Sequence, residues 1–141
     1  GGLKARGLNA LEMLARLYWY TVEFGLVDTP QGVRAYGGGI LSSVGELRHS
    51  VTSPEPRRVP FALSRVMRTR FRIDVYQPTY FVIRDFQQLF DETAADFAPI
   101  YRELRDLPVI EPGALLAGEQ ELPASSGETD RVSQAGAPIR A

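Results

Sequence analysis

Apolar residues near the start of the chain recur at three- and four-residue steps. The positions are Leu8, Leu11, Leu14, Ala15, Tyr18 and Val22. This spacing is typical of an amphipathic helix, which we expect from about Leu8 to Phe24. Gly25 is expected to end it in the left-handed conformation that favours glycine. A helix of that length, on the order of 25 Å, would be a core element.

Turn residues and a glycine run follow this helix. The segment Asp28–Gly32 contains Pro and Gly and predicts a turn. The three glycines Gly37–Gly39 allow backbone approaches that side chains forbid, so we expect a loop shaped around something. Ser43 and Glu46 have the spacing of a capping box at the start of another helix.

Short elements are predicted in the second half of the chain. Alternating apolar residues over 71–76 and the β-prone run 79–83 predict two short strands. Helices are expected at 60–70, with Leu63, Val66 and Met67 buried, at 86–90 behind the cap Asp85, and at 94–104.

The composition changes after residue 107. Gly, Pro, Ser, Glu and Ala dominate residues 111–141, aromatic residues are absent, and no period survives. We therefore divide the chain into a folded unit, 1–107, and a flexible polar tail, 108–141. The predicted fold class is mainly α with a small β component (α+β).

Composition and charge narrow the function classes. The chain has 141 residues, 44% of them hydrophobic, which suits one soluble domain. With 16 basic and 17 acidic residues it shows no electrostatic footprint for nucleic acid, and Arg65, Arg68, Arg70 and Arg72 are interpreted as a solvated face. No run is long enough to span a membrane, and no signal peptide is visible. The absence of cysteine fits a cytoplasmic protein.

Glu23 is a single carboxylate in surroundings that disfavour a negative charge. It lies in the aromatic and apolar run Leu17–Leu26, near the expected C-terminal end of the helix. Burying an unpaired carboxylate there costs several kcal/mol, so we expect a cation beside it. Arg16, two turns earlier, could form an ion pair, although Glu12 competes for it. A metal ion is the other candidate, since a carboxylate is a hard oxygen ligand; the residues alone leave both open. His49 is the only histidine and is expected at the surface.

Three ordered motifs carry a family resemblance over about 1–107. They are the runs LARLYWYTVEFG (14–25), YGGGILSS (36–43) and YQPTYFV (76–82). Together they resemble the C-terminal part of the catalytic domain of the pterin-dependent aromatic amino acid hydroxylases, especially the bacterial phenylalanine hydroxylases. The resemblance implies part of that catalytic-domain fold.

The resemblance also implies a chemistry. It points to hydroxylation of L-phenylalanine to L-tyrosine with O₂ and tetrahydrobiopterin at a non-haem Fe(II) held by two histidines and one glutamate. Glu23 matches the carboxylate ligand. Four positions match residues that bind the amino acid substrate in the family: Trp19, Phe24, Gly39 and Ser42. Two positions match residues on the pterin side: Ala15 and Tyr18.

The chain departs from the family pattern in two places. The family's His-x-x-x-x-His element would lie upstream of Gly1, and the chain starts without Met, so we expect a processed or truncated product. Gly38 stands where alanine is usual. The C-terminal tail has no heptad pattern of the kind that forms an assembly helix, so we expect a monomer. The alternatives are a tyrosine or tryptophan hydroxylase, and a non-catalytic scaffold or binding fragment.

Overall fold

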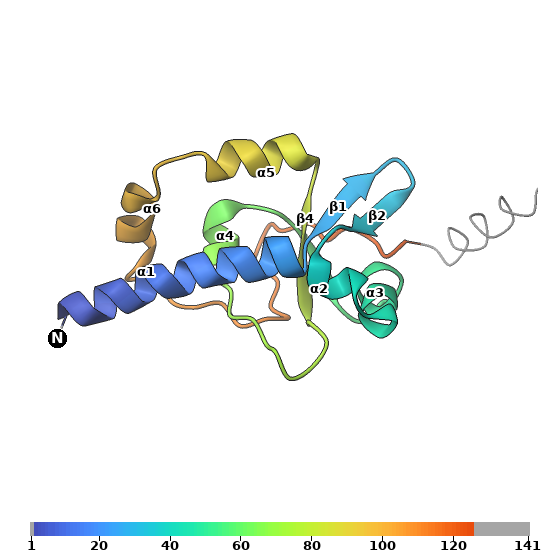
Figure 1. Ribbon diagram of the computed structural model, residues 1–141, viewed down its shortest axis with the longest axis horizontal. Coiled ribbons are helices and arrows are strands. Elements are labelled where there is room, and N and C mark those ends of the chain that lie inside the picture. Colours follow the sequence, from blue (N-terminus) through green and yellow to red (C-terminus); the bar gives the residue numbers. More distant parts are fainter. Residues whose placement is uncertain (1, 126–141) are drawn as a thin grey trace, which may run out of the picture.

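The longest element is a helix that crosses one face of the molecule (Figure 1). A computed structural model describes residues 2–125, and it describes side chains from residue 10 onward. Helix α1 (Gly2–Tyr18) runs directly into a five-residue π-helix, η1 (Trp19–Glu23). The predicted helix is therefore confirmed, but it begins earlier and ends in a wider turn. Its buried side carries Met13 and Leu17, whereas part of the predicted apolar stripe is exposed: Leu11, Leu14, Tyr18 and Val22.

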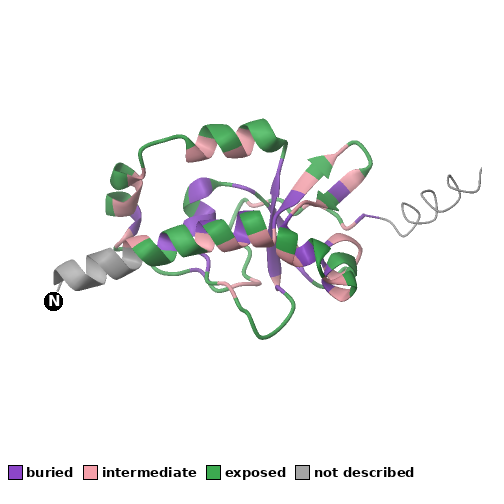
Figure 2. Cartoon of the chain, in the orientation of Figure 1, coloured by how far each residue is buried: buried purple, intermediate pink, exposed green. Residues whose placement is uncertain are grey.

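Within residues 2–125, four short strands form one sheet in the order β2-β1-β4-β3. They are β1 (Leu26–Thr29), β2 (Gly32–Ala35), β3 (Arg57–Pro60) and β4 (Thr79–Ile83). β1 and β2 form an antiparallel hairpin, and β4 lies parallel to both β1 and β3. All five residues of β4 are buried, as Figure 2 shows, which suits a central strand covered on both faces.

Alternate residues of β4 face two separate hydrophobic clusters. Phe81 and Ile83 pack with Tyr20 and Met67 below the long helix, and Tyr80 and Val82 pack on the other side with Leu26, Val33 and Ile40. The predicted burial of Leu63, Val66 and Met67 is confirmed.

In the part of the chain that the structure describes, five further helices pack on the sheet and on the long helix. They are α2 (Gly38–Leu41), α3 (Val44–Val51), α4 (Leu63–Arg68), α5 (Phe86–Thr93) and α6 (Phe97–Leu104). The predicted caps are confirmed, since Ser43 Oγ accepts the Glu46 N–H at 3.2 Å and Asp85 accepts the Gln88 N–H at 2.9 Å. The mainly helical α+β class is confirmed. Among the helices of residues 2–125, none combines the length and apolar character that crossing a bilayer requires.

Several local predictions were wrong. Residues 71–76 form an irregular loop, because side chains hold its backbone instead of strand pairing: Tyr20 donates to the Arg70 carbonyl and Gln77 donates to the Arg72 carbonyl. Pro60 ends strand β3 instead of beginning a helix. Gly25 does not have a positive φ; it is glycine because a Cβ there would lie 2.1 Å from the Tyr36 ring.

The segment 108–125 lies against the folded body, which differs from the expected tail boundary at 108. Ile110 forms a β-bridge with Thr69, the Leu122 N–H donates to the Arg58 carbonyl at 2.8 Å, and the Ser125 N–H donates to the Val51 carbonyl at 2.8 Å. The rest of the predicted flexible tail, 126–141, lies outside the described residues.

Arg65 fastens this segment to α4 and is not on a solvated face as expected. It is buried, lies over the Phe81 ring at 5.3 Å, and donates from Nε to Glu119 at 2.8 Å. Burial raises the pKa of Glu119, but hydrogen bonds from Arg65 and from the Leu116 N–H outweigh it and leave that pKa below its ordinary value.

Replacing Glu119 by Gln should lower the free energy of unfolding by about 2 kcal/mol. This lies between the effects of removing an exposed and a buried ion pair. Because the folded pKa is depressed, the pair stabilises the fold above the unfolded pKa of about 4.3 and the contribution is lost as the pH falls through the folded value. Urea unfolding at pH 7 and at pH 3 measures both effects. Glu121→Gln, which removes the exposed pair with Arg57 (2.9 Å), is the control and should cost about 0.5 kcal/mol or less. Equal losses in the two variants would contradict the assignment.

Candidate active site

The π-helix η1 gathers the first group of candidate residues. Its last turn is closed by the Phe24 N–H, which donates to the Trp19 carbonyl at 2.9 Å. A bond from residue i+5 to residue i places Phe24 over Trp19, and their ring centroids lie 5.1 Å apart. The Thr21 hydroxyl donates to the Leu17 carbonyl at 2.6 Å, where the helical register changes. π-Turns of this kind occur frequently at functional sites.

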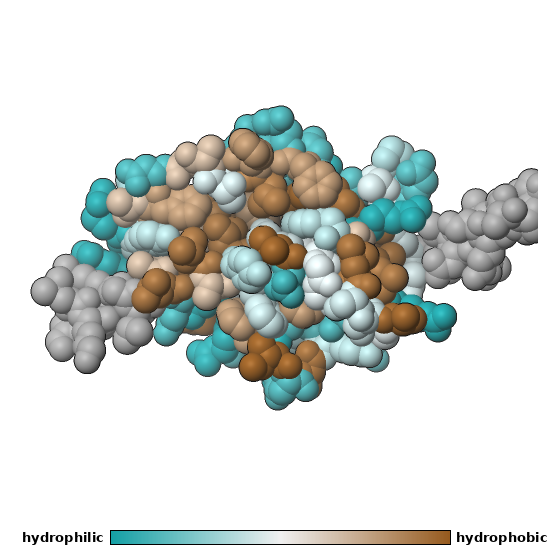
Figure 3. Space-filling model, viewed as in Figure 1, coloured by the Kyte–Doolittle hydropathy of each residue, from teal (hydrophilic) through white to brown (hydrophobic). Residues whose placement is uncertain are grey.

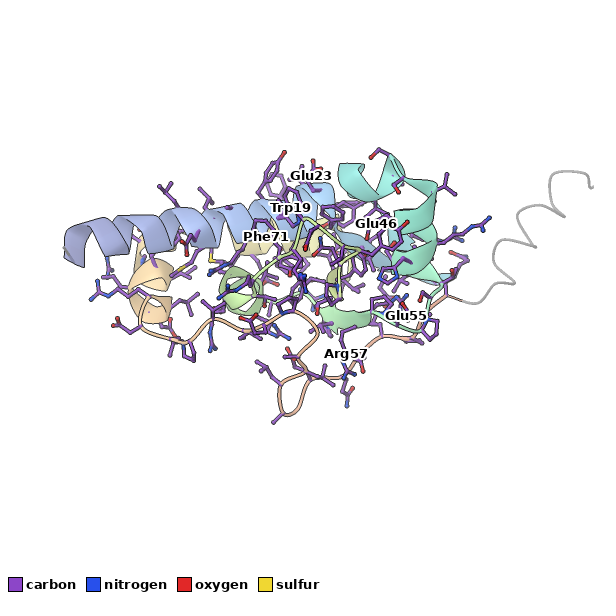
Figure 4. The ribbon with its side chains drawn as sticks, turned by 90° about the horizontal axis from the view of Figure 1, so that it is seen from below. Trp19, Glu23, Glu46, Glu55, Arg57 and Phe71 are labelled. Carbon is purple, nitrogen blue, oxygen red and sulfur yellow. The ribbon has the colours of Figure 1, made fainter. Side chains whose placement is uncertain are left out.

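Glu23 is half-buried at the end of this turn and has no side-chain partner among the side chains described. The ion pair with Arg16 is not formed: Arg16 bonds Glu12 at 3.4 Å and the Met67 carbonyl at 3.1 Å. The sequence offered two candidate cations for Glu23, Arg16 and a metal ion. Since Arg16 is bonded elsewhere, the Glu23 carboxylate is available for a cation from outside the described residues. Figure 4 shows Glu23 and Trp19 together at the end of the long helix.

Two glycines pack directly against the Glu23 backbone. The β1–β2 hairpin returns the chain so that the Tyr36 and Gly37 N–H groups both donate to the Gly25 carbonyl, at 3.1 and 3.2 Å. A Cβ on Gly37 would lie 2.4 Å from the Glu23 carbonyl oxygen. A Cβ on Gly39 would lie 3.0 Å from both that oxygen and Glu23 Oε2, and 3.1 Å from the Phe24 ring. The glycine run is thus shaped around Glu23, although Gly38–Leu41 forms a helical turn rather than the predicted loop.

Trp19 stands between two other aromatic rings. Its ring stacks on Phe71 at 4.8 Å with an interplanar angle of 22°, and meets Phe24 at 41°. The Trp19 Nε1 atom is buried and has no hydrogen-bond partner among the described residues. We call Trp19, Phe24 and Phe71 the aromatic cluster. Sequence reasoning missed Phe71, which was placed in a strand.

The remaining predicted residues surround this centre. Ser42 is exposed and its hydroxyl donates to the Gly39 carbonyl at 3.1 Å, so it belongs to the same turn as Gly39. Ala15 and Tyr18 lie one turn before Trp19 and Val22 and are exposed. Tyr18 lines a groove of about 330 Å³ between α1 and α5, together with Leu14, Val22 and Leu89. Figure 3 shows hydrophobic surface along this side of the molecule.

A second carboxylate, Glu46, is also buried but is fully used. Its side chain accepts a hydrogen bond from the Tyr80 hydroxyl and another from the Gln77 N–H at 3.4 Å, instead of closing the capping box. Burial, and then the bond to Glu46, raise the pKa of Tyr80. His49, expected at the surface, is half-buried and bonds the Gln77 carbonyl at 3.0 Å. These residues join α3 to the loop that carries Phe71.

The described metal-ligating side chains of this site are too few to hold a metal ion by themselves. Within residues 2–125 no three His, Cys, Asp or Glu side chains gather into a metal-binding group. Glu23 can supply one carboxylate oxygen, so further ligands would have to come from other residues. An unpaired, half-buried carboxylate beside an aromatic cluster fits a hard metal ion of incomplete coordination.

Comparison with known proteins places this arrangement in a family. Residues 2–105 match the model of the biopterin-dependent aromatic amino acid hydroxylases. The chain belongs to that family, which confirms the resemblance.

Its relatives include bacterial phenylalanine-4-hydroxylases. The protein from Ralstonia nicotianae is 54% identical over 128 residues, covering 91% of this chain and 41% of the relative, and that from Chromobacterium violaceum is 62% identical over 106 residues, covering 75% and 36%. A crystal structure of the Chromobacterium enzyme with iron and phenylalanine bound matches with a TM-score of 0.79 at 56% identity, over 86% of this chain and 46% of that one. The chain thus spans less than half the length of these relatives.

The glycine packing gives a stability prediction with an adjacent control. Gly39→Ala should cost about 2 kcal/mol, because the added methyl group presses on Glu23 and Phe24. Gly38→Ala should leave stability unchanged or raise it by up to about 1 kcal/mol, since its Cβ would meet nothing closer than 3.9 Å. Urea unfolding of the two variants measures this difference. Equal effects would show that the close approach to Glu23 is not needed.

Proposed function

We propose that this chain forms the iron- and substrate-bearing part of a phenylalanine 4-monooxygenase that converts L-phenylalanine to L-tyrosine. The observation that carries the proposal is the unpaired Glu23 carboxylate, held against Gly39 and beside Trp19 and Phe24. The named activity of the bacterial relatives and the phenylalanine bound in one of their structures support the substrate. Bound iron and tetrahydrobiopterin would together supply the activation of O₂.

Glu23 has the properties that an iron ligand needs. Its backbone is fixed by Gly37 and Gly39, so the carboxylate is presented in one direction with little freedom to lose on binding. No cation among the side chains described competes for it. Half-burial strengthens its interaction with a bound ion relative to bulk water.

The aromatic cluster would form the wall for the substrate ring. The flat faces of Trp19 and Phe24 exclude water and give an aromatic amino acid offset or edge-on contacts. Gly39 packs closely against Glu23 and Phe24 and so holds the carboxylate beside the substrate wall, and Ser42 presents a hydroxyl from the same turn. Tyr18 lines the groove beside α1, and Ala15 is exposed one turn before Trp19 on the same helix; we place the pterin on this part of α1. The monomeric state and the cytoplasmic location expected from the sequence remain predictions.

A chimeric enzyme tests the proposal. Residues 2–105 of this chain replace the matching segment of the Chromobacterium violaceum phenylalanine-4-hydroxylase, which supplies the rest of the catalytic domain. The chimera should bind iron and hydroxylate phenylalanine in a pterin-dependent reaction, faster than tyrosine or tryptophan. Turnover of another of these amino acids in preference would favour a sibling hydroxylase, and an inactive, iron-free chimera would favour a non-catalytic role.

Within the chimera, Glu23→Gln should lower iron content and reduce turnover at least about 100-fold, since the amide keeps the size but removes the charge of the ligand. Glu12→Gln, which removes an exposed carboxylate from the same helix, should leave both unchanged. Metal analysis and the rate of tyrosine formation are the measurements. Normal iron and turnover in Glu23→Gln would refute the metal-ligand role.

A further inference from the structure

The orientation of the Trp19 ring rests on packing alone. Its Nε1 atom is buried without a hydrogen-bond partner among the described residues, so no polar contact there fixes the ring. Phe24 meets it at a tilt of 41°, whereas Phe71 lies almost parallel to it at 4.8 Å. One face of the indole ring is therefore backed by Phe71, and Figure 4 shows these two side chains next to each other.

Phe71 is in turn held from the core. The Tyr20 ring meets it edge-on at 6.5 Å, and the Tyr20 hydroxyl donates to the carbonyl of Arg70, the preceding residue, at 2.6 Å. Tyr20 is fully buried and packs edge-on against Phe81 of the central strand. The position of Phe71 thus follows from the sheet through Tyr20.

The far end of the same loop is fastened independently. The Gln77 side chain donates to the Arg72 carbonyl, and the Gln77 N–H donates to the buried Glu46. Between these points the loop side chains Ile73, Val75 and Tyr76 are exposed. The loop is therefore exposed in its middle, and hydrogen bonds to its backbone fix it at both ends, one of them next to Phe71.

We propose that Phe71 is a positioning residue for the aromatic substrate: it backs the Trp19 ring and thereby sets the depth of the substrate wall. The effect on substrate selectivity rests on the proposed function. The contact by which Phe71 holds Trp19 in place is a property of this chain alone. Removing the Phe71 ring lets Trp19 recede into the space behind it. The site then favours phenylalanine less strongly over the larger tryptophan.

The first test uses Trp19 as its own reporter, since it is the only tryptophan of the chain. In the 141-residue chain, Phe71→Ala should shift the emission maximum to longer wavelength and increase quenching by acrylamide, because the indole gains contact with water. Phe71→Tyr keeps the ring and should restore the original spectrum. Phe97→Ala is the matched control, because Phe97 is also half-buried against the same core but meets Tyr101 edge-on instead of Trp19. Circular dichroism identifies any variant that has not folded.

The second test measures selectivity in the chimera. Phe71→Ala should lower the ratio of kcat/KM for phenylalanine to that for tryptophan by about three- to tenfold, the scale of one aromatic pair. KM for phenylalanine should rise while iron content stays unchanged, and Phe71→Tyr should restore the ratio.

The outcomes separate the two proposals. Unchanged Trp19 emission and quenching in a folded Phe71→Ala chain would overturn the positioning role, whatever the activity. An unchanged selectivity ratio in an active chimera would overturn it as well. An inactive unsubstituted chimera would count against the proposed function, and the fluorescence result would still decide whether Phe71 positions Trp19.

Discussion

The structure of the candidate site depends on one close backbone approach, between the end of the π-helix and the glycines of the following turn. Gly37 lies so near the Glu23 carbonyl that any side chain would collide with it. The approach is possible because the β1–β2 hairpin is short and in register, with Leu26 opposite Ala35 and Thr29 opposite Gly32. A longer or slipped hairpin would move Gly37 and Gly39 away from Glu23. The direction of one carboxylate is thus set by the geometry of a two-residue turn.

The positive charges of the surrounding residues are committed elsewhere. Arg16 bonds the Met67 carbonyl and Glu12, and Arg65 bonds Glu119 and the Ala114 carbonyl. Burial lowers the pKa of Arg16, yet its hydrogen bonds hold it toward α4 rather than toward Glu23. The fold therefore stabilises its arginines with carbonyls and other carboxylates, and it leaves the carboxylate at the end of the long helix without a counter-charge among the side chains described.

Local signals in the sequence predicted the long helix, the strand at 79–83 and the caps at Ser43 and Asp85, because each depends on neighbours within a few positions. The misplaced features depend on distant residues. Residues 71–76 alternate like a strand, but the side chains that hold them are Tyr20 and Gln77, and Glu119, which pairs with the buried Arg65, lies 54 positions later in the chain.

The site was predictable to a similar extent. The motifs placed Glu23, Trp19, Phe24, Gly39 and Ser42 by resemblance, and the structure brings these five together. The π-turn that puts Phe24 over Trp19 has no pattern of its own in the sequence. Phe71 was missed for the same reason as the loop, since its contact with Trp19 spans 52 positions and nothing near it signals that contact.

Two carboxylates near this centre show how environment separates a structural role from a chemical one. Glu23 and Glu46 are the same residue type, and both are at least half-buried. Glu46 accepts hydrogen bonds from Tyr80 and Gln77, so its charge is satisfied inside the protein and any added cation would have to displace those donors. Glu23 has no such donors among the side chains described. An unpaired, partly buried carboxylate costs free energy in the absence of a partner. The fold would therefore gain most from a cation at Glu23, and that gain is the physical basis for proposing Glu23, and not Glu46, as a metal ligand.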